Sequence, residues 1–209
     1  MAREDLAGTT EELDRLADRL HPEQNRREVL GRLDEVFRSG GVPDPWPAGF
    51  AGGRLLAAAT WGPWDSVVQR IAGLWMPWLG KSFDGATNTG INRFRQTAGT
   101  RWWMRVLFPS HTPALIAGDL MEAFPFRNAA GPGEVDQDVQ VLKIDYDFEA
   151  NPALIRRVLD ELVEVGPGVY LGKILFRLGG RYRADSVPQR YQSIQFLPAR
   201  FARGEVLDH

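Results

Sequence analysis

The sequence has no cysteine, only three histidines and only three lysines among its 25 basic residues. The absence of cysteine excludes disulfides, thiolate catalysis and cysteine-ligated zinc or iron–sulfur sites, and it is typical of proteins in a reducing compartment. The histidines, His21, His111 and His209, are too scattered for a metal site. We therefore expect neither a metal nor another cofactor.

The sequence also lacks long apolar runs and an excess of charge of either sign. No segment approaches the roughly 20 apolar residues of a membrane-spanning helix, and the polar N-terminus has no signal-peptide core. With 25 basic against 27 acidic residues, there is no basic stripe for a nucleic-acid backbone. The glycine-rich stretch 85–90 lacks the lysine of a phosphate-binding loop and the dinucleotide fingerprint. These absences predict a cytoplasmic protein without a nucleic-acid, nucleotide or membrane partner.

Residues 1–41 are expected to form a helical arm of two amphipathic helices, 9–20 and 22–39. Thr9 and Glu12 have the spacing of a capping box at the start of the first helix. Each helix has one apolar face that must be covered. The arm is therefore expected to lie either on the rest of the chain or on a second copy in a homodimer.

The remaining residues, 42–209, show a hydrophobic period of mostly two, which is typical of β-strands. The expected strands cover 54–60, 78–84, 90–96, 101–108, 121–127, 139–147, 169–178 and 191–197. Two helices are expected at 64–75 and 151–165, the second because Asn151 and Pro152 suit its first turn. Short strands joined by short loops predict a single α+β domain with an antiparallel, barrel-like and lipocalin-like sheet of about eight strands. Such a barrel has room inside for side chains or one small ligand.

All seven tryptophans lie in one stretch of the chain: Trp46, Trp61, Trp64, Trp75, Trp78, Trp102 and Trp103. An indole buries a large apolar area and keeps one N–H donor, so the cluster suits either an apolar core or a flat ligand pocket. Trp102 and Trp103 are adjacent in an expected strand and would point to opposite faces. At most one of them would then line the interior of a barrel.

Two expected strands contain a similar four-residue motif, aromatic–Leu–Gly–Lys. The motif is Trp78-Leu79-Gly80-Lys81 in the first strand and Tyr170-Leu171-Gly172-Lys173 in the second. A glycine beside the lysine lets a ligand or another backbone approach closely. Each lysine is either an edge charge that reaches water or an inward charge that awaits an anionic group.

The acid–base candidates are Asp84, Asp145, Tyr146 and His111. Asp145 and Asp147 share one face of an expected strand, where two carboxylates either lie in solvent or raise one another's pKa for general acid–base work. His111 lies in a loop between two prolines, and such a histidine is usually exposed. No nucleophile elbow accompanies it.

Trp75–Asp84 (WMPWLGKSFD), Asn92 and the Asp145–Asp147 run resemble uncharacterised bacterial proteins named for a GXWXG motif. The motif itself is absent, and Thr60–Trp64 (TWGPW) is the nearest run. The resemblance implies a lipocalin-like fold and no settled activity, and 142–178 is similar to actinobacterial proteins.

The first functional hypothesis is a binding protein for a small, largely apolar molecule with one anionic or carbonyl group. The candidate ligand-binding residues are Trp75, Trp78, Lys81, Asn92, Trp103, Tyr170 and Lys173. The second hypothesis is a cofactor-free isomerase or cyclase for a polyketide- or terpenoid-like molecule, which would use the acid–base candidates. The third is an interaction protein whose tryptophans form a core and whose arm docks on a partner.

Overall fold

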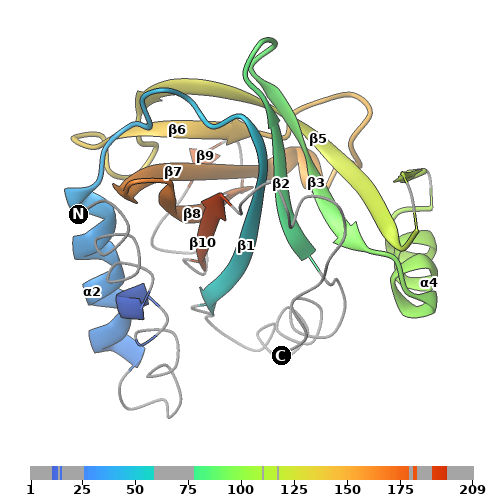
Figure 1. The fold of residues 1–209 in the computed structure, drawn as a ribbon, viewed down its shortest axis with the longest axis horizontal. Coiled ribbons are helices and arrows are strands. Elements are labelled where there is room, and N and C mark those ends of the chain that lie inside the picture. The colour runs from blue at the N-terminus through green and yellow to red at the C-terminus, as the bar shows by residue number, and fades with distance from the viewer. Residues whose placement is uncertain are drawn as a thin grey trace.

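The computed structural model describes residues 11–13, 15, 26–58, 78–109, 111–116, 118–178, 181–182 and 190–196. Most of this part of the chain forms an antiparallel sheet that curls into a barrel-like shape (Figure 1). The strands are β1 (Gly49–Ala58), β2 (Trp78–Asp84), β3 (Thr89–Arg95), β4 (Ala114–Leu115), β5 (Leu120–Pro132), β6 (Gln140–Asp145), β7 (Val158–Gly166), β8 (Val169–Leu178), β9 (Arg181–Tyr182) and β10 (Arg190–Phe196). The labelled helices are α2 (Arg26–Ser39), α4 (Ala98–Leu107) and the 3-10 turn η2 (Ile155–Arg157). None of the helices in the described ranges combines the length and the apolar character that crossing a bilayer requires.

The sheet follows the order β10-β1-β2-β3-β5-β6-β7-β8-β9, and β4 pairs with β5. Strand β10 pairs antiparallel with both β1 and β8, so the path of hydrogen-bonded strands returns to its start. A sheet that curls in this way has an inner and an outer face, and successive side chains of each strand point to opposite faces. The expected antiparallel, barrel-like α+β fold is confirmed at this level.

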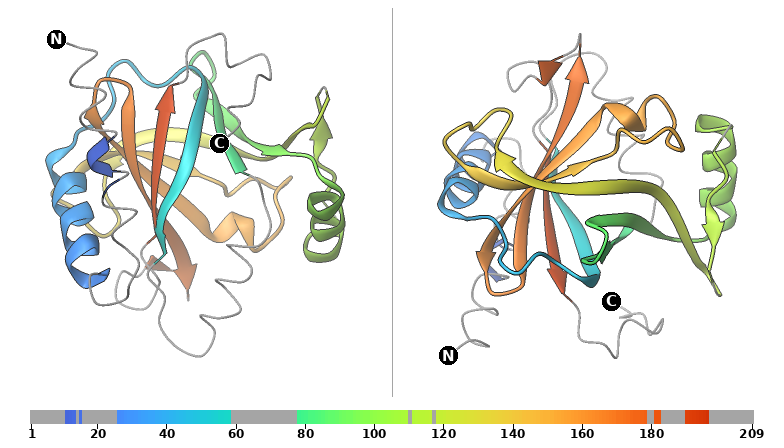
Figure 2. Two further views of the ribbon diagram at one scale, coloured as in Figure 1. Left: turned by 60° about the horizontal axis from the view of Figure 1, so that its bottom comes forward. Right: turned by 90° about the horizontal axis from the view of Figure 1, so that it is seen from above.

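Two apolar clusters cover the two faces of the sheet. Helix α2 lies against the outside of the curled sheet, with α4 at the opposite side of the molecule (Figures 1 and 2). The outer cluster joins Leu13 and the apolar face of α2 to β7, β8, β6 and the residue before β6: Leu13, Val29, Leu33, Phe37, Val139, Val141, Val163, Val169 and Leu171. The inner cluster contains Ala51, Phe83, Phe94, Met104, Phe108, Met121, Ala123, Phe124, Phe126, Leu142, Ile144, Tyr146, Leu162 and Tyr170. The apolar face of α2 is therefore covered by this chain's own sheet.

The prediction of a strand over 101–108 is wrong, because these residues belong to helix α4 and the short segment after it. Thr97 is the N-cap of α4, and its hydroxyl accepts a hydrogen bond of 3.1 Å from the backbone N–H of Thr100. Such a cap satisfies one of the free N–H groups at the start of a helix. The aromatic and branched residues of this segment suggested a strand, but the cap and the local helical turn decide its structure.

The prediction of a helix over 151–165 is also wrong. The chain forms the single 3-10 turn η2 and then β7, which pairs with β6 and β8. Asn151 does not cap a helix; its side-chain amide donates to the carbonyls of Pro125 and Tyr146 at 2.7 and 2.8 Å. Both faces of β7 are buried, so apolar residues occur on both faces and imitate a helical spacing.

Most other expected strands are confirmed within a few residues, and β1 begins earlier than expected, at Gly49. The second arm helix is confirmed over the residues of α2. The expected helix at 64–75 and most of the first arm helix lie outside the described residues.

Candidate functional site

Two lysines are almost fully buried, and they lie on opposite faces of the sheet. The exposed fraction is 2% for Lys81 and 1% for Lys173. Lys81 lies on the inner face with the inner apolar cluster, whereas Lys173 lies on the outer face beneath α2. A buried ammonium is rare unless it is paired, so the partners of each lysine define a candidate site.

The inner lysine is the centre of a polar network between apolar walls. The Nζ of Lys81 lies 2.8 Å from Oδ2 of Asp160 and donates to Oδ1 of Asn92 at 3.0 Å and to the hydroxyl of Tyr146 at 2.5 Å. The Tyr146 hydroxyl donates to the same Asp160 oxygen at 3.0 Å. The indole N–H of Trp78 donates to Oδ1 of Asn92 at 3.1 Å. Side chains from β2, β3 and β7 thus meet inside the sheet, together with Tyr146, the residue that follows β6.

A bulge in β2 brings two of these side chains to one place. In a regular strand Trp78 and Lys81 would point to opposite faces, because they are three residues apart. The pairing register with β3 shifts between Trp78 and Gly80, and both side chains then reach Asn92. Gly80 has a φ of +146°, and a Cβ there would lie 2.0 Å from the carbonyl oxygen of Ala51. Only glycine permits this close approach of β1 to the bulge.

A second bulge, in β5, fixes the orientation of Asn92. The register of β3 and β5 shifts beside Asn92, and Phe124 at the bulge has a φ of +59°. This conformation is strained for an aromatic residue. It presents the Phe124 carbonyl to the Asn92 side-chain amide at 3.1 Å. The ring of Phe124 is held by Phe108 at 5.3 Å and by His111, stacked at 4.9 Å. Bulges often re-aim side chains next to functional sites.

The donors and acceptors of the inner network can be counted atom by atom. Lys81 uses its three N–H bonds on Asp160, Asn92 and Tyr146. Asn92 uses its amide nitrogen on the Phe124 carbonyl and on the Tyr146 hydroxyl. Within the described part of the chain, the other carboxylate oxygen of Asp160, Oδ1, has no hydrogen-bond partner although it is buried. The donors of the network are therefore all used, and one buried acceptor, Oδ1 of Asp160, lacks a partner.

Burial also shifts the ionisation of the network. Desolvation lowers the pKa of Lys81 from its usual value, and the charge of Asp160 only partly opposes this effect. Desolvation and the nearby Asp160 charge raise the pKa of Tyr146 well above 10. At neutral pH Tyr146 is therefore a neutral hydroxyl that donates to the carboxylate. The ammonium also lies over the ring of Trp78, 5.2 Å from the ring centroid, a cation–π contact.

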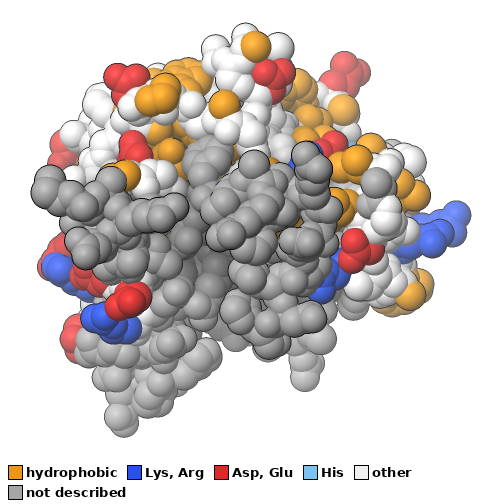
Figure 3. Space-filling model, viewed as in Figure 1, with side chains coloured by type: hydrophobic (Ala, Val, Ile, Leu, Met, Phe, Trp, Pro, Cys, Tyr) orange, Lys and Arg blue, Asp and Glu red, His pale blue; other side chains and the backbone are white. Residues whose placement is uncertain are grey.

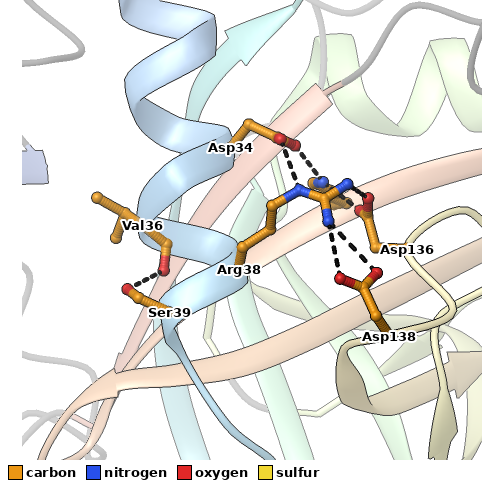
Figure 4. Close-up of polar contacts among 7 residues, drawn as sticks. Asp34, Val36, Arg38, Ser39, Asp136 and Asp138 are labelled. Carbon is orange, nitrogen blue, oxygen red and sulfur yellow. Dashed lines mark hydrogen bonds and ion pairs between the residues drawn. The ribbon is translucent and has the colours of Figure 1, made fainter.

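The outer lysine forms a second charged cluster that joins α2 to the sheet. Nζ of Lys173 donates to Asp34 on α2 and to Asp136 in the β5–β6 loop, both at 2.5 Å. Figure 4 shows Arg38 of α2 reaching Asp34, Asp136 and Asp138 from the same helix face. Asp34 and Asp136 are each shared between Lys173 and Arg38, so the cluster is a structural junction between α2 and the sheet.

The structure brings together four of the candidate residues, Trp78, Lys81, Asn92 and Tyr146, and Tyr170 belongs to the same inner apolar cluster. Tyr146 is at the centre of the network, although it was expected only as an acid–base candidate. The other candidates lie elsewhere or cannot be placed. Lys173 is on the outer face, the side chain of Trp103 in α4 is not described, and Trp75 lies outside the described residues.

The remaining acid–base candidates lie outside the inner network. Asp84 is exposed at the β2–β3 turn and accepts from Thr87 and the backbone of Ala86, which lowers its pKa. Asp145 is exposed and accepts from the backbone N–H of Asp147 at 2.9 Å. His111 is half-buried, and its Nδ1 lies 3.2 Å from the carbonyl oxygen of Ala150.

Sequence reasoning missed Asp160, the carboxylate of the inner network. Asp160 and Glu161 lie within 151–165, where a helix was expected, and neither was a candidate site residue. The available signal was a pair of acids inside a run of branched apolar residues, which is unusual for a surface helix. An acid at this position in a strand buried on both faces needs a buried partner.

The surface beside α4 carries exposed apolar side chains, with exposed fractions of 58% for Trp102 and 63% for Leu115. Figure 3 shows hydrophobic side chains on the side where Figure 1 places α4 and β4.

In the described ranges no group of three or more His, Asp or Glu side chains is arranged to hold a metal ion. Comparisons with protein families, with curated proteins and with solved structures found no match to this chain.

Proposed function

We propose that the protein binds a small, largely apolar molecule inside a lipocalin-like sheet, with the polar end of the molecule against the Lys81–Asp160 network. The observation that carries this proposal is the unpartnered Oδ1 of Asp160. A buried carboxylate oxygen without a partner costs about 1–3 kcal/mol or more, so such an atom needs an explanation. A bound ligand supplies one.

The surroundings of the network support an apolar ligand. Phe83, Phe94, Phe126, Leu142, Ile144, Leu162 and Tyr170 share the inner cluster with Tyr146. Ligand sites typically combine apolar walls with a few well-placed polar groups. Two bulges and one strained residue, Phe124, hold these polar groups in position, and strain of this kind occurs mostly at functional sites.

The test is native mass spectrometry of the freshly purified full chain, compared with the same sample after denaturation. We expect a small molecule that is released on denaturation or, if the purified protein is empty, saturable quenching of tryptophan fluorescence by an apolar phenol such as 4-propylphenol. Trp78 is the reporter because its indole N–H is part of the network. An empty protein whose fluorescence does not respond to apolar probes would contradict the proposal.

A second candidate function is cofactor-free acid–base catalysis on the same kind of molecule. The observation that favours it is the pair formed by Asp160, an available base, and the Tyr146 hydroxyl 3.0 Å from its other oxygen. Proton transfer by positioned groups of this kind contributes typically about 10²–10⁴-fold. Incubation with a simple aryl ketone in D2O tests it: exchange of the α-protons that disappears in Asp160→Asn supports catalysis, and exchange at the solvent rate opposes it.

A further inference from the structure

We infer that the polar end of the ligand is a neutral hydrogen-bond donor, such as a phenol or alcohol hydroxyl, which donates to Oδ1 of Asp160. This inference rests on the proposed binding function and adds the chemical class of the ligand. It replaces the anionic or carbonyl group that the sequence suggested for the lysines.

The directions of the hydrogen bonds in the network favour a ligand that donates. An anionic or carbonyl group needs a free donor, and the three N–H bonds of Lys81 already point to protein acceptors. The Trp78 indole donates to Asn92, and the Tyr146 hydroxyl donates to Asp160. The polar hydrogens of the network are thus engaged, and among its described atoms the buried Oδ1 of Asp160, an acceptor, lacks a partner.

The charges in the network favour a neutral ligand group. The ammonium of Lys81 balances one carboxylate, Asp160, at 2.8 Å, and the exposed fractions of the two side chains are 2% and 3%. An anionic ligand beside Oδ1 would add a like charge in a dry environment, which is strongly unfavourable. A neutral donor gives the Asp160 carboxylate its missing hydrogen bond and leaves the net charge of the Lys81–Asp160 pair unchanged.

The position of Asp160 in the sheet strengthens a hydrogen bond to its carboxylate. Its neighbours in register are Ile144 on β6 and Ile174 on β8. Apolar side chains therefore flank the carboxylate on both neighbouring strands. A hydrogen bond to a charged group in such surroundings is worth about 1.5–3 kcal/mol, which corresponds to roughly tenfold or more in affinity.

The experiment uses three probes of one size: 4-propylphenol, its methyl ether 4-propylanisole, and 4-propylbenzoate. Their affinities for the full chain are measured by isothermal titration calorimetry. We expect the phenol to bind at least about tenfold more tightly than the ether, because only the phenol can donate. We expect the benzoate to bind no more tightly than the ether.

Two variants locate the effect. Asp160→Asn should reduce the preference for the phenol over the ether to within about threefold, because an N–H can then face the ligand. Glu161→Gln is the matched control: it makes the same acid-to-amide change one residue later, on the other face of β7, and should keep the preference. If Asp160→Asn does not fold, the ratio in the unmodified chain still decides the donor class.

The outcomes separate the two proposals. Equal affinity for phenol and ether, or tightest binding of the benzoate, would overturn the donor inference and leave ligand binding intact. A preference for the phenol that survives in folded Asp160→Asn would also overturn it. Failure of all three probes, together with an empty protein by native mass spectrometry, would overturn the binding function itself and this inference with it.

Discussion

Asp160 and Glu161 are adjacent in β7, and their carboxylates are buried on opposite faces of the sheet. Asp160 is 2.8 Å from Nζ of Lys81 inside the sheet, and Glu161 accepts from the backbone N–H of Glu134 at 2.6 Å on the outside. Desolvation raises the pKa of Glu161 from its usual value. One strand thus supplies a buried acid to each face of the sheet.

Replacement of Lys81 by methionine should destabilise the protein by about 3–5 kcal/mol, because it leaves the Asp160 carboxylate buried without its cation. The double variant Lys81→Met with Asp160→Leu should recover at least half of this loss, since no buried charge remains. Urea denaturation followed by tryptophan fluorescence gives the free energies of unfolding. Simple additivity of the two single changes would show that the ion pair is not energetically coupled.

Replacement of Lys173 by methionine should loosen helix α2, because Asp34 and Asp136 lose their shared cation. We expect faster amide hydrogen exchange in α2, with little change in the environment of Trp78. Arg32→Ala is the control, since its ion pairs with Glu12 and Glu35 are exposed to solvent and contribute little to stability. Equal effects of the two changes on α2 would argue against a buried junction.

Alkaline pH should destabilise the folded protein. Burial raises the pKa of Tyr170 to about 12, and that of Tyr146 is also raised above 10. Above about pH 10 the unfolded chain loses these protons first, so the folded state binds more protons and its free energy of unfolding falls as pH rises.

Lys81 acts in the opposite sense, because its pKa is lowered in the folded state. The contribution of Lys81 to the pH dependence of the free energy of unfolding ends near pH 10.5, where the lysine of the unfolded chain has also lost its proton. Urea denaturation above that pH should therefore show a falling free energy of unfolding, with a smaller slope in Tyr170→Phe. An unchanged slope in this variant would assign the alkaline transition to other groups.

Replacement of Gly53 by alanine should displace the Trp78 ring, because the added Cβ would lie 2.1 Å from it. We expect a loss of about 1–3 kcal/mol from overpacking, a shifted tryptophan emission and weaker binding of 4-propylphenol. Gly31→Ala in α2 is the control: its Cβ would meet no atom within 4 Å, and alanine should stabilise the helix by about 0.5–1 kcal/mol. Unchanged emission in Gly53→Ala would contradict this placement of Trp78.

The inner site was only partly predictable from the sequence. The aromatic–Leu–Gly–Lys pattern indicated Lys81, and the resemblance to the GXWXG proteins indicated Asn92 and Tyr146. The pattern also suggested that Lys81 and Lys173 serve one pocket. The bulge at Gly80 changes the direction of the side chains in the first motif, whereas the pairing register of β8 does not shift at the second motif. No local signal in either motif distinguishes the two cases.

The sequence by itself determined the alternating strands, the amphipathic α2 and the antiparallel class, because side-chain period and turn residues act locally. Only the tertiary structure decided that 158–166 is a strand and not a helix. For β7 the physical reason is burial of both faces, which removes the polar alternation that marks a strand. The tertiary structure alone also paired Lys81 with Asp160, since contacts between distant strands depend on register and bulges.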